Sequence, residues 1–253
     1  MKPTDVMRTY RKPIEAISRR TVLKASIVGA STVGAIGSAA GSGSTDGDGG
    51  VSCDDDERED EPDSDPDSDI VTQTTDVIGQ GPDGDVLSED GATIHRTPND
   101  ILIEFSMPTP EPGAYTYPSG PPEREGEWWT DEAGDLEAFS LWAFTFDFPD
   151  DCENDCGSED LGEPAGGGAY HVAGHAFSGP DLTFNGYVST ETDLYEDDGE
   201  PAGVTVERPM DAEVHLAVAP HGAFDPAMMP EILETPTGPG PDVWWIALFD
   251  PPA

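Results

Sequence analysis

The amino-acid sequence predicts an all-β protein. An antiparallel β-sandwich over residues 71–253 follows a signal segment (1–40) and a disordered acidic linker (41–70). From about residue 71 the chain alternates short runs of β-branched and aromatic residues with Pro, Gly and Asp, the pattern of strands joined by turns. No stretch keeps an apolar period of 3.6 residues over three helical turns. The predicted strands are Ile70–Val77, Ala92–Arg96, Ile101–Ser106, Phe139–Phe148, Ala169–Phe177, Leu182–Ser189, Glu213–Ala219 and Val243–Phe249.

The N-terminal segment resembles a twin-arginine export signal. Basic residues precede the pair Arg19-Arg20, and a weakly apolar stretch follows from Ala25 to about Ala40. Ser38-Ala39-Ala40 offers small residues for cleavage. The stretch is shorter and more polar than the roughly 20 apolar residues of a membrane-spanning helix, so we expect no transmembrane span in the mature chain.

The linker is built from Gly, Ser, Asp, Glu and Pro, which leaves it little apolar surface to bury and predicts disorder. Alternate aspartates begin at Asp63, as in a calcium loop. Such a loop needs Gly at its sixth position and Glu at its twelfth, where this chain has Ser68 and Thr74, so the calcium loop is excluded. Cys53 also lies in the linker, and the sequence leaves open whether it is free or lipidated.

Charge is the strongest compositional signal. The chain has 53 acidic and 11 basic residues, a formal net charge of −42, and no lysine after Lys24. A surface this acidic repels phosphate, which excludes nucleic acid and anionic lipid surfaces as partners. The absence of lysine from the mature chain excludes Schiff-base chemistry there. Together with the export signal, this composition resembles that of a secreted protein from a salt-loving archaeon, whose self-repulsion molar salt largely screens.

The strand at Phe139–Phe148 has bulky residues on both faces, which predicts a central position in the sheet. In Glu213–Ala219 the apolar residues alternate with Glu213 and His215. We therefore expect His215 to point away from the core, on the side of Glu213.

Cys152 and Cys156 lie four residues apart in an acidic loop. A local disulfide is the expected state in an oxidising compartment. The spacing is one residue too long for a thioredoxin-like pair, and no second cysteine pair completes a zinc site.

The histidines offer a possible transition-metal site, formed by His175, His215 and His221 from neighbouring strands. His171 and His175 should share one face of their strand, but four residues span about 13 Å, too far for both to bind one ion. We expect the rings of His175, His215 and His221 to be scattered, each with its own hydrogen-bond partner. We predict no cofactor.

Enzyme motifs do not stand out in the sequence. It has no Gly-x-Ser-x-Gly, no His-Glu-x-x-His and no Gly-rich phosphate loop, and carboxylate pairs are too frequent to identify a glycosidase. The doublet Trp128-Trp129 lies in an acidic, Pro-rich stretch, where it could stack against a sugar or cover the edge of the sandwich.

A series of short motifs runs from residue 92 to 223. They are Gly113–Thr116, Leu141–Pro149, Cys152, Cys156-Gly157, Asp160-Leu161, Ala173–His175, Phe184–Gly186, Ala212–Leu216 and His221-Gly222. Their order resembles that in a family of uncharacterised secreted β-rich proteins of bacteria and archaea. The resemblance implies a secreted β fold, a Cys152–Cys156 loop and a family role for His175, His215 and His221, and it implies no reaction.

These observations favour a non-enzymatic exported β-sandwich, secreted or held at the cell surface, that binds an unidentified partner or has a structural role there. A small His-ligated metalloprotein and a carbohydrate-binding module that uses Trp128 and Trp129 are the alternatives. The twin-arginine export machinery is a further expected partner.

Export should depend on the paired guanidinium groups. Replacing Arg19 and Arg20 by Lys keeps the charge but removes the planar groups. We expect the precursor to accumulate inside the cell, measured by immunoblotting of cell and medium fractions. Unchanged secretion would contradict the twin-arginine assignment.

Overall fold

The computed structural model describes residues 70–79, 84–115, 134–197, 199–234 and 244–252. The predicted signal segment with Arg19 and Arg20, the linker up to Asp69 with Cys53, and the Trp128-Trp129 doublet lie outside these residues. No helix within the described ranges is long and apolar enough to cross a membrane.

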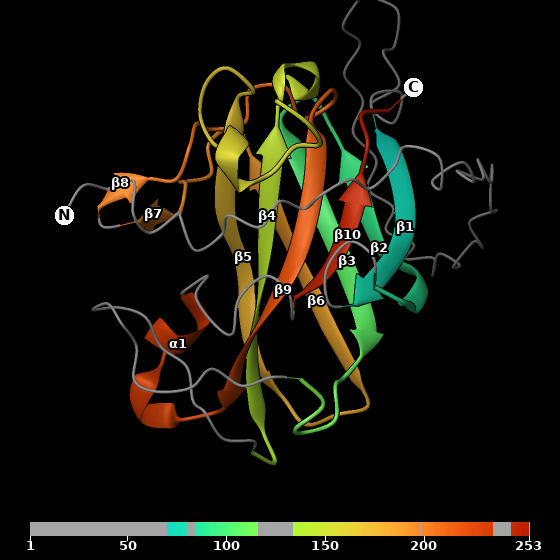
Figure 1. Cartoon of the computed structure of the whole chain (residues 1–253), viewed down its shortest axis with the longest axis vertical. Coiled ribbons are helices and arrows are strands. Elements are labelled where there is room, and N and C mark those ends of the chain that lie inside the picture. Colours follow the sequence, from blue (N-terminus) through green and yellow to red (C-terminus); the bar gives the residue numbers. More distant parts are fainter. Residues whose placement is uncertain (1–69, 80–83, 116–133, 198, 235–243, 253) are drawn as a thin grey trace, which may run out of the picture. The chain divides into compact units, whose positions relative to one another are not determined.

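All eight predicted strands are present, and they form one antiparallel sheet, which confirms the all-β fold class (Figure 1). In space the strands follow the order β5-β4-β9-β10-β1-β2-β3-β6. A short hairpin, β7 (Glu196–Asp197) and β8 (Glu200–Pro201), was not predicted. The strands of the main sheet are β1 (Val71–Gly79), β2 (Val86–Arg96), β3 (Asp100–Pro108), β4 (Glu137–Phe146), β5 (Gly167–Phe177), β6 (Asp181–Ser189), β9 (Glu213–Ala223) and β10 (Trp245–Phe249).

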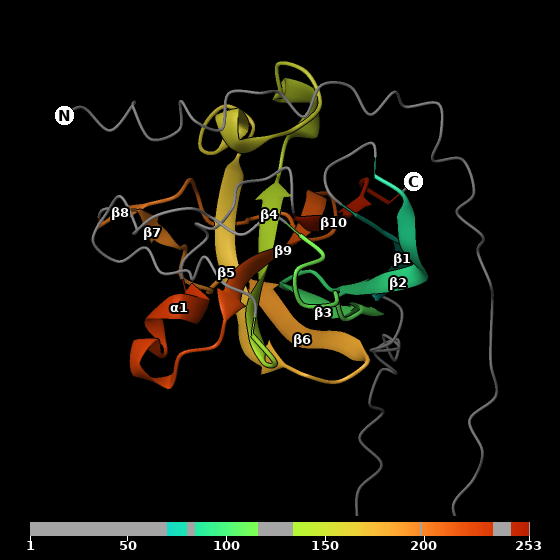
Figure 2. The same ribbon diagram turned by 60° about the horizontal axis from the view of Figure 1, so that its bottom comes forward.

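The sheet wraps nearly into a barrel, so that two four-stranded halves face each other across the core (Figure 2). The halves β5-β4-β9-β10 and β1-β2-β3-β6 join where β10 pairs with β1 over only two residue pairs. At the opposite side β5 and β6 form no ladder with each other, which leaves a seam. Side chains fill this seam, and a Cβ atom added to Gly186 would collide with Val172.

The core follows from the period of two in the strands. Ile101, Ile103, Phe105 and Met107 of β3 are buried, whereas the residues between them are exposed. One hydrophobic cluster collects the inward residues of all eight strands. The predicted start of β2 at Ala92 was too late, because Ser88-Glu89-Asp90-Gly91 has the composition of a turn. In the structure these residues continue the strand through an irregular register with β1.

Strand β4 is buried on both faces, as its sequence predicted. Its outward side chains contact three coverings. The first is the loop 147–166, which packs Cys156 and Ala165 against Phe146. The second includes Tyr195 and Trp244. The third is the short helix α1 (Glu231–Glu234), whose Ile232 and Leu233 pack with Ala138.

The segment 204–212, which we call the closing segment, is bound by side chains from both halves of the sheet. The Tyr170 hydroxyl of β5 accepts a hydrogen bond from the Val206 N–H at 2.6 Å. The Asp147 carboxylate, just after β4, accepts from the N–H groups of Glu207 and Arg208 at 2.7 and 3.2 Å.

Arg96 binds the closing segment from β2. Its guanidinium is fully buried and donates to the carbonyl oxygens of Pro209 and Ala212 at 2.7 and 2.8 Å, while its Nε donates to Gln73 of β1 at 2.7 Å. Burial lowers the pKa of Arg96 to about 10, and Asp211 opposes this effect, so the group stays charged at neutral pH. The guanidinium therefore supplies hydrogen-bond donors to two carbonyl groups of buried residues, which would cost free energy if left unpaired.

Loss of these bonds should destabilise the fold. Arg96→Met retains much of the side-chain volume but leaves the Pro209 and Ala212 carbonyl groups without donors. We expect the free energy of unfolding to fall by about 2 kcal/mol in denaturant titrations at molar salt, since each unsatisfied buried group costs about 1–3 kcal/mol and relief of charge burial offsets part of this.

Arg208→Met is the matched control. It removes the same charge, but Arg208 forms an exposed ion pair with Asp211, and such pairs contribute about 0–1 kcal/mol. Equal destabilisation by the two substitutions would show that lost charge, rather than the buried hydrogen bonds, causes the effect.

Candidate functional site

His215 points to the outer face of β9, as predicted. Its Nε2 atom lies 2.7 Å from the Glu213 carboxylate, and its ring contacts Phe146 with a centroid distance of 5.2 Å. Val214, Leu216 and Val218 lie on the opposite face, in the core. The contact between these two half-buried side chains is therefore local, joining two outward positions of β9.

His175 lies at the seam, on the core side of β5. Its ring stacks on Phe184 of β6 at a centroid distance of 5.7 Å and meets the edge of Phe177 at 5.8 Å. It pairs in register with Phe139, which is fully buried. His175 thus closes the open side of the sheet by aromatic packing while remaining exposed to solvent itself.

His221 belongs to a buried hydrogen-bonded chain on the outer face of β4 and β9. Its Nε2 atom lies 2.7 Å from the Ser140 hydroxyl oxygen, which also accepts from the Trp142 indole N–H at 2.8 Å. All three side chains are fully buried. A Ser-His contact of this kind can activate a hydroxyl, but no substrate can reach an oxygen with no exposed surface. The hydrogen bonds among these three side chains therefore link β4 to β9.

The three predicted ligands consequently have three different sets of neighbours. Within the residues that the structure describes, no group of three or more His, Cys, Asp or Glu side chains is placed to hold a metal ion.

His171 lies on the opposite face of β5 from His175. The prediction that His171 and His175 share a face was wrong, because a bulge in β5 shifts the register between Leu141 and Trp142. His171 consequently faces outward, with its ring 5.1 Å from that of Trp142, whereas His175 faces the core. Gly174 also faces outward, and a Cβ atom there would collide with Leu233 of α1.

Burial lowers the pKa of His171 below its usual value. The nearby Glu234 carboxylate opposes this shift without cancelling it. The Nε2 atom of His171 is buried and has no hydrogen-bond partner. The folded state therefore favours the neutral imidazole beneath α1.

The disulfide between Cys152 and Cys156 is present, as predicted. Cys156 is buried against Phe146 and Ala165. The bond closes a short turn inside the loop 147–166, and the packing of Cys156 places this turn against the end of β4 as part of the covering of the outer face.

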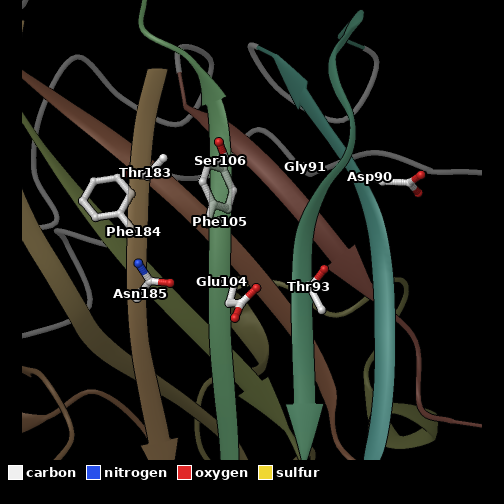
Figure 3. A pocket seen from close by; sticks show the side chains of 9 residues that line it. All are labelled: Asp90, Gly91, Thr93, Glu104, Phe105, Ser106, Thr183, Phe184 and Asn185. Atoms are coloured by element: carbon white, nitrogen blue, oxygen red, sulfur yellow. The ribbon is translucent and has the colours of Figure 1, made fainter. Parts of the chain in front are cut away.

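The outer face of β2, β3 and β6 lacks such a covering among the described residues, and we call it the bare face. Strand pairing places Thr93, Glu104 and Asn185 in one row across the three strands, as Figure 3 shows. With Gly91, Ser106 and Thr183 above them, they line a shallow hollow of about 370 Å³. The Asp90 carboxylate, at the edge of this hollow, points away from the row (Figure 3).

A second row on the bare face contains its exposed apolar surface. Leu102 and Tyr187 are direct cross-strand neighbours, and 45% and 62% of their surfaces are exposed. His95 stands beside Leu102 on β2, and its Nδ1 atom lies 2.8 Å from the Thr72 hydroxyl. These residues were not among the predicted site residues, although the alternation in β3 and β6 already placed them opposite the core.

Comparisons with protein-family models, with curated proteins and with solved structures find no match for this chain. The family resemblance drawn from sequence motifs stays a prediction.

The neutral state of His171 should make stability depend on pH. The unfolded chain takes up a proton at His171 near pH 6.5, and the folded state resists this, so the free energy of unfolding should fall as the pH drops through about 6.5. Glu234 and His175 are the titratable groups that act on this ring.

His171→Gln removes the titrating group. Between pH 7.5 and 5.5 in molar salt, we expect the variant to lose less stability than the wild type, by at most about 1.4 kcal/mol for each unit of pKa difference. Thr93→Val, on the bare face, removes no titrating group and is the control, which should keep the wild-type slope. Identical slopes for His171→Gln and the wild type would contradict the argument.

Proposed function

We propose that this protein is an exported β-sandwich without enzymatic activity, which binds a partner outside the cell through its bare face. The observation that carries the proposal is the asymmetry of the sheet. The outer face of β4 is covered by a disulfide-bonded loop, a helix and aromatic side chains, whereas β2, β3 and β6 expose Leu102 and Tyr187 beside a polar hollow. Exposed apolar side chains next to polar side chains that can form hydrogen bonds with a ligand are typical of binding surfaces.

Export is supported by the twin-arginine pattern at Arg19-Arg20 and by the composition. A local disulfide is stable in an oxidising compartment, which is consistent with a place outside the cytoplasm. The excess of carboxylates retains water and cations at molar salt, consistent with a halophilic source.

The absence of enzymatic activity is supported by the placement of the reactive groups. Among the described residues, Ser140 and His221 lie within hydrogen-bond distance of each other, and both are inaccessible. Glu104 and Asp90 flank the hollow, but the Asp90 carboxylate points away from it. Two carboxylates that do not face a common point cannot act as an acid and base pair on one bond.

The metalloprotein alternative would require His175, His215 and His221 to exchange their present partners for a common ion. The alternative through Trp128 and Trp129 concerns residues outside the described ranges.

Binding should be measurable with isolated cell envelopes of the producing organism. We expect the purified full chain to co-sediment with these envelopes in molar KCl. The double variant Leu102→Ser/Tyr187→Ser should lose most of this binding, because it removes the exposed apolar row.

Val86→Ser is the matched control, since Val86 is 51% exposed but lies near the start of β2, away from the Leu102–Tyr187 row. If the double variant co-sediments as strongly as the wild type, the proposed role of the bare face is refuted. It is also refuted if the wild type does not co-sediment with the envelopes.

A further inference from the structure

We infer that the partner of the bare face is a neutral polysaccharide, with a sugar ring stacked on Tyr187 and its hydroxyl groups bound by Asn185 and Glu104. This inference rests on the proposed function, because it concerns the same surface and specifies the chemical class of the ligand.

The hydrogen-bonding groups of the bare face match a polyhydroxylated ligand. The Glu104 carboxylate only accepts, the Asn185 amide both donates and accepts, and the Thr93 and Thr183 hydroxyls do both. A ligand that satisfies all of them must present donors and acceptors side by side. Each sugar hydroxyl is one donor and one acceptor, so neighbouring hydroxyls meet this requirement.

The charge of the bare face disfavours anionic ligands. Of the chain's four arginines after Lys24, Arg96 is buried in the core and Arg208 is paired with Asp211. Arg58 and Arg124 lie outside the described residues. The bare face itself holds Glu104 and, at its rim, the Asp90 carboxylate, with no lysine or arginine among its residues. A phosphate, sulfate or carboxylate ligand would therefore meet repulsion without a compensating cation.

The dimensions also fit a stacked sugar. Tyr187 and Asn185 are two residues apart on β6, a spacing of about 6.8 Å, and Glu104 lies on the adjacent strand about 4.8 Å from Asn185. A ring that packs its C–H face on Tyr187 would place its edge hydroxyls toward these two polar side chains. Leu102, directly opposite Tyr187, extends the apolar platform for the next part of the ligand.

The shallowness of the hollow favours a polymer over a small molecule. Pockets for small ligands enclose most of the ligand surface, and an open hollow on a sheet face cannot do this. An extended polymer instead gains affinity from contacts along its length and from repeated engagement of similar units.

A protein partner is less favoured by the composition of the bare face. A stable protein interface buries about 800 Å² on each side around an apolar core. Apart from Val86 and Leu87 at the start of β2, the exposed large apolar side chains of the three strands are Leu102 and Tyr187, within a polar surround.

The test uses the full chain in molar KCl and two treatments of the isolated envelopes. Periodate oxidises vicinal diols of glycans, and proteinase K removes exposed proteins. We expect periodate to reduce co-sedimentation at least tenfold and proteinase K to leave it largely unchanged.

Single substitutions then assign the contact. Tyr187→Ala should weaken binding about tenfold and Asn185→Ala several-fold, whereas Tyr187→Phe should retain binding because the stacking surface remains. Circular dichroism spectra that match the wild type establish that each variant is folded, which the exposure of both side chains leads us to expect.

The outcomes separate the two proposals. Binding that depends on Tyr187 but survives periodate and is lost after proteinase K would overturn the polysaccharide ligand and keep the bare face as a binding surface. Binding to periodate-sensitive material that is unaffected by Tyr187→Ala and Asn185→Ala would overturn the stacked arrangement. Absence of any envelope binding by the wild type would overturn both proposals.

Discussion

Three buried side chains from β2, β5 and the end of β4 hold the closing segment against one end of the sheet. Arg96 donates to two of its carbonyl groups, Asp147 accepts from two of its N–H groups, and the Tyr170 hydroxyl accepts from a third. The strand ladder joins the halves of the sheet over only two residue pairs, between β10 and β1. The Arg96 hydrogen bonds from β2 therefore add a polar connection between the two halves at this end. In a chain with a net charge of −42, an arginine in the core is conspicuous, and its place is set by carbonyl groups rather than by a carboxylate partner.

With the two halves joined, the sheet has an inner face that forms the core and an outer face that is covered in one part and open to water in another. Over β4 and its neighbours, the outward side chains are large and apolar, and loops, a helix and a disulfide are needed to cover them. Over β2, β3 and β6, the outward side chains are mostly polar and can remain in water. Apart from Val86 and Leu87 at the start of β2, the exposed large apolar side chains of these strands are Leu102 and Tyr187, and their adjacency marks the bare face as a surface for binding.

Bulges decide which side chains reach each face. A bulge in β5 turns His171 outward beneath α1 while His175 stays on the core side. A second register shift, between β4 and β9, lies beside His221, whose ring contacts Ser140 on the outer face. Each bulge inserts one residue into a period of two. The side chains beyond the bulge therefore point to the opposite face of the sheet from the one that strict alternation predicts. The distribution of the histidines follows from these shifts.

The sequence by itself determined the number and approximate positions of the eight main strands, the burial of β4 on both faces, the outward direction of His215 and the Cys152–Cys156 bond. Each of these depends on local information, such as the alternation of apolar residues or the short spacing of two cysteines. The tertiary structure alone decided where the bulges occur, which outer face is covered, and how Leu102 comes to stand beside Tyr187. It also decided the contacts of Ser140 with His221 and of Arg96 with Ala212, which lie 81 and 116 residues apart in the chain. Such contacts depend on the pairing and register of strands distant in the sequence, and a period of two along one strand carries no information about its neighbour.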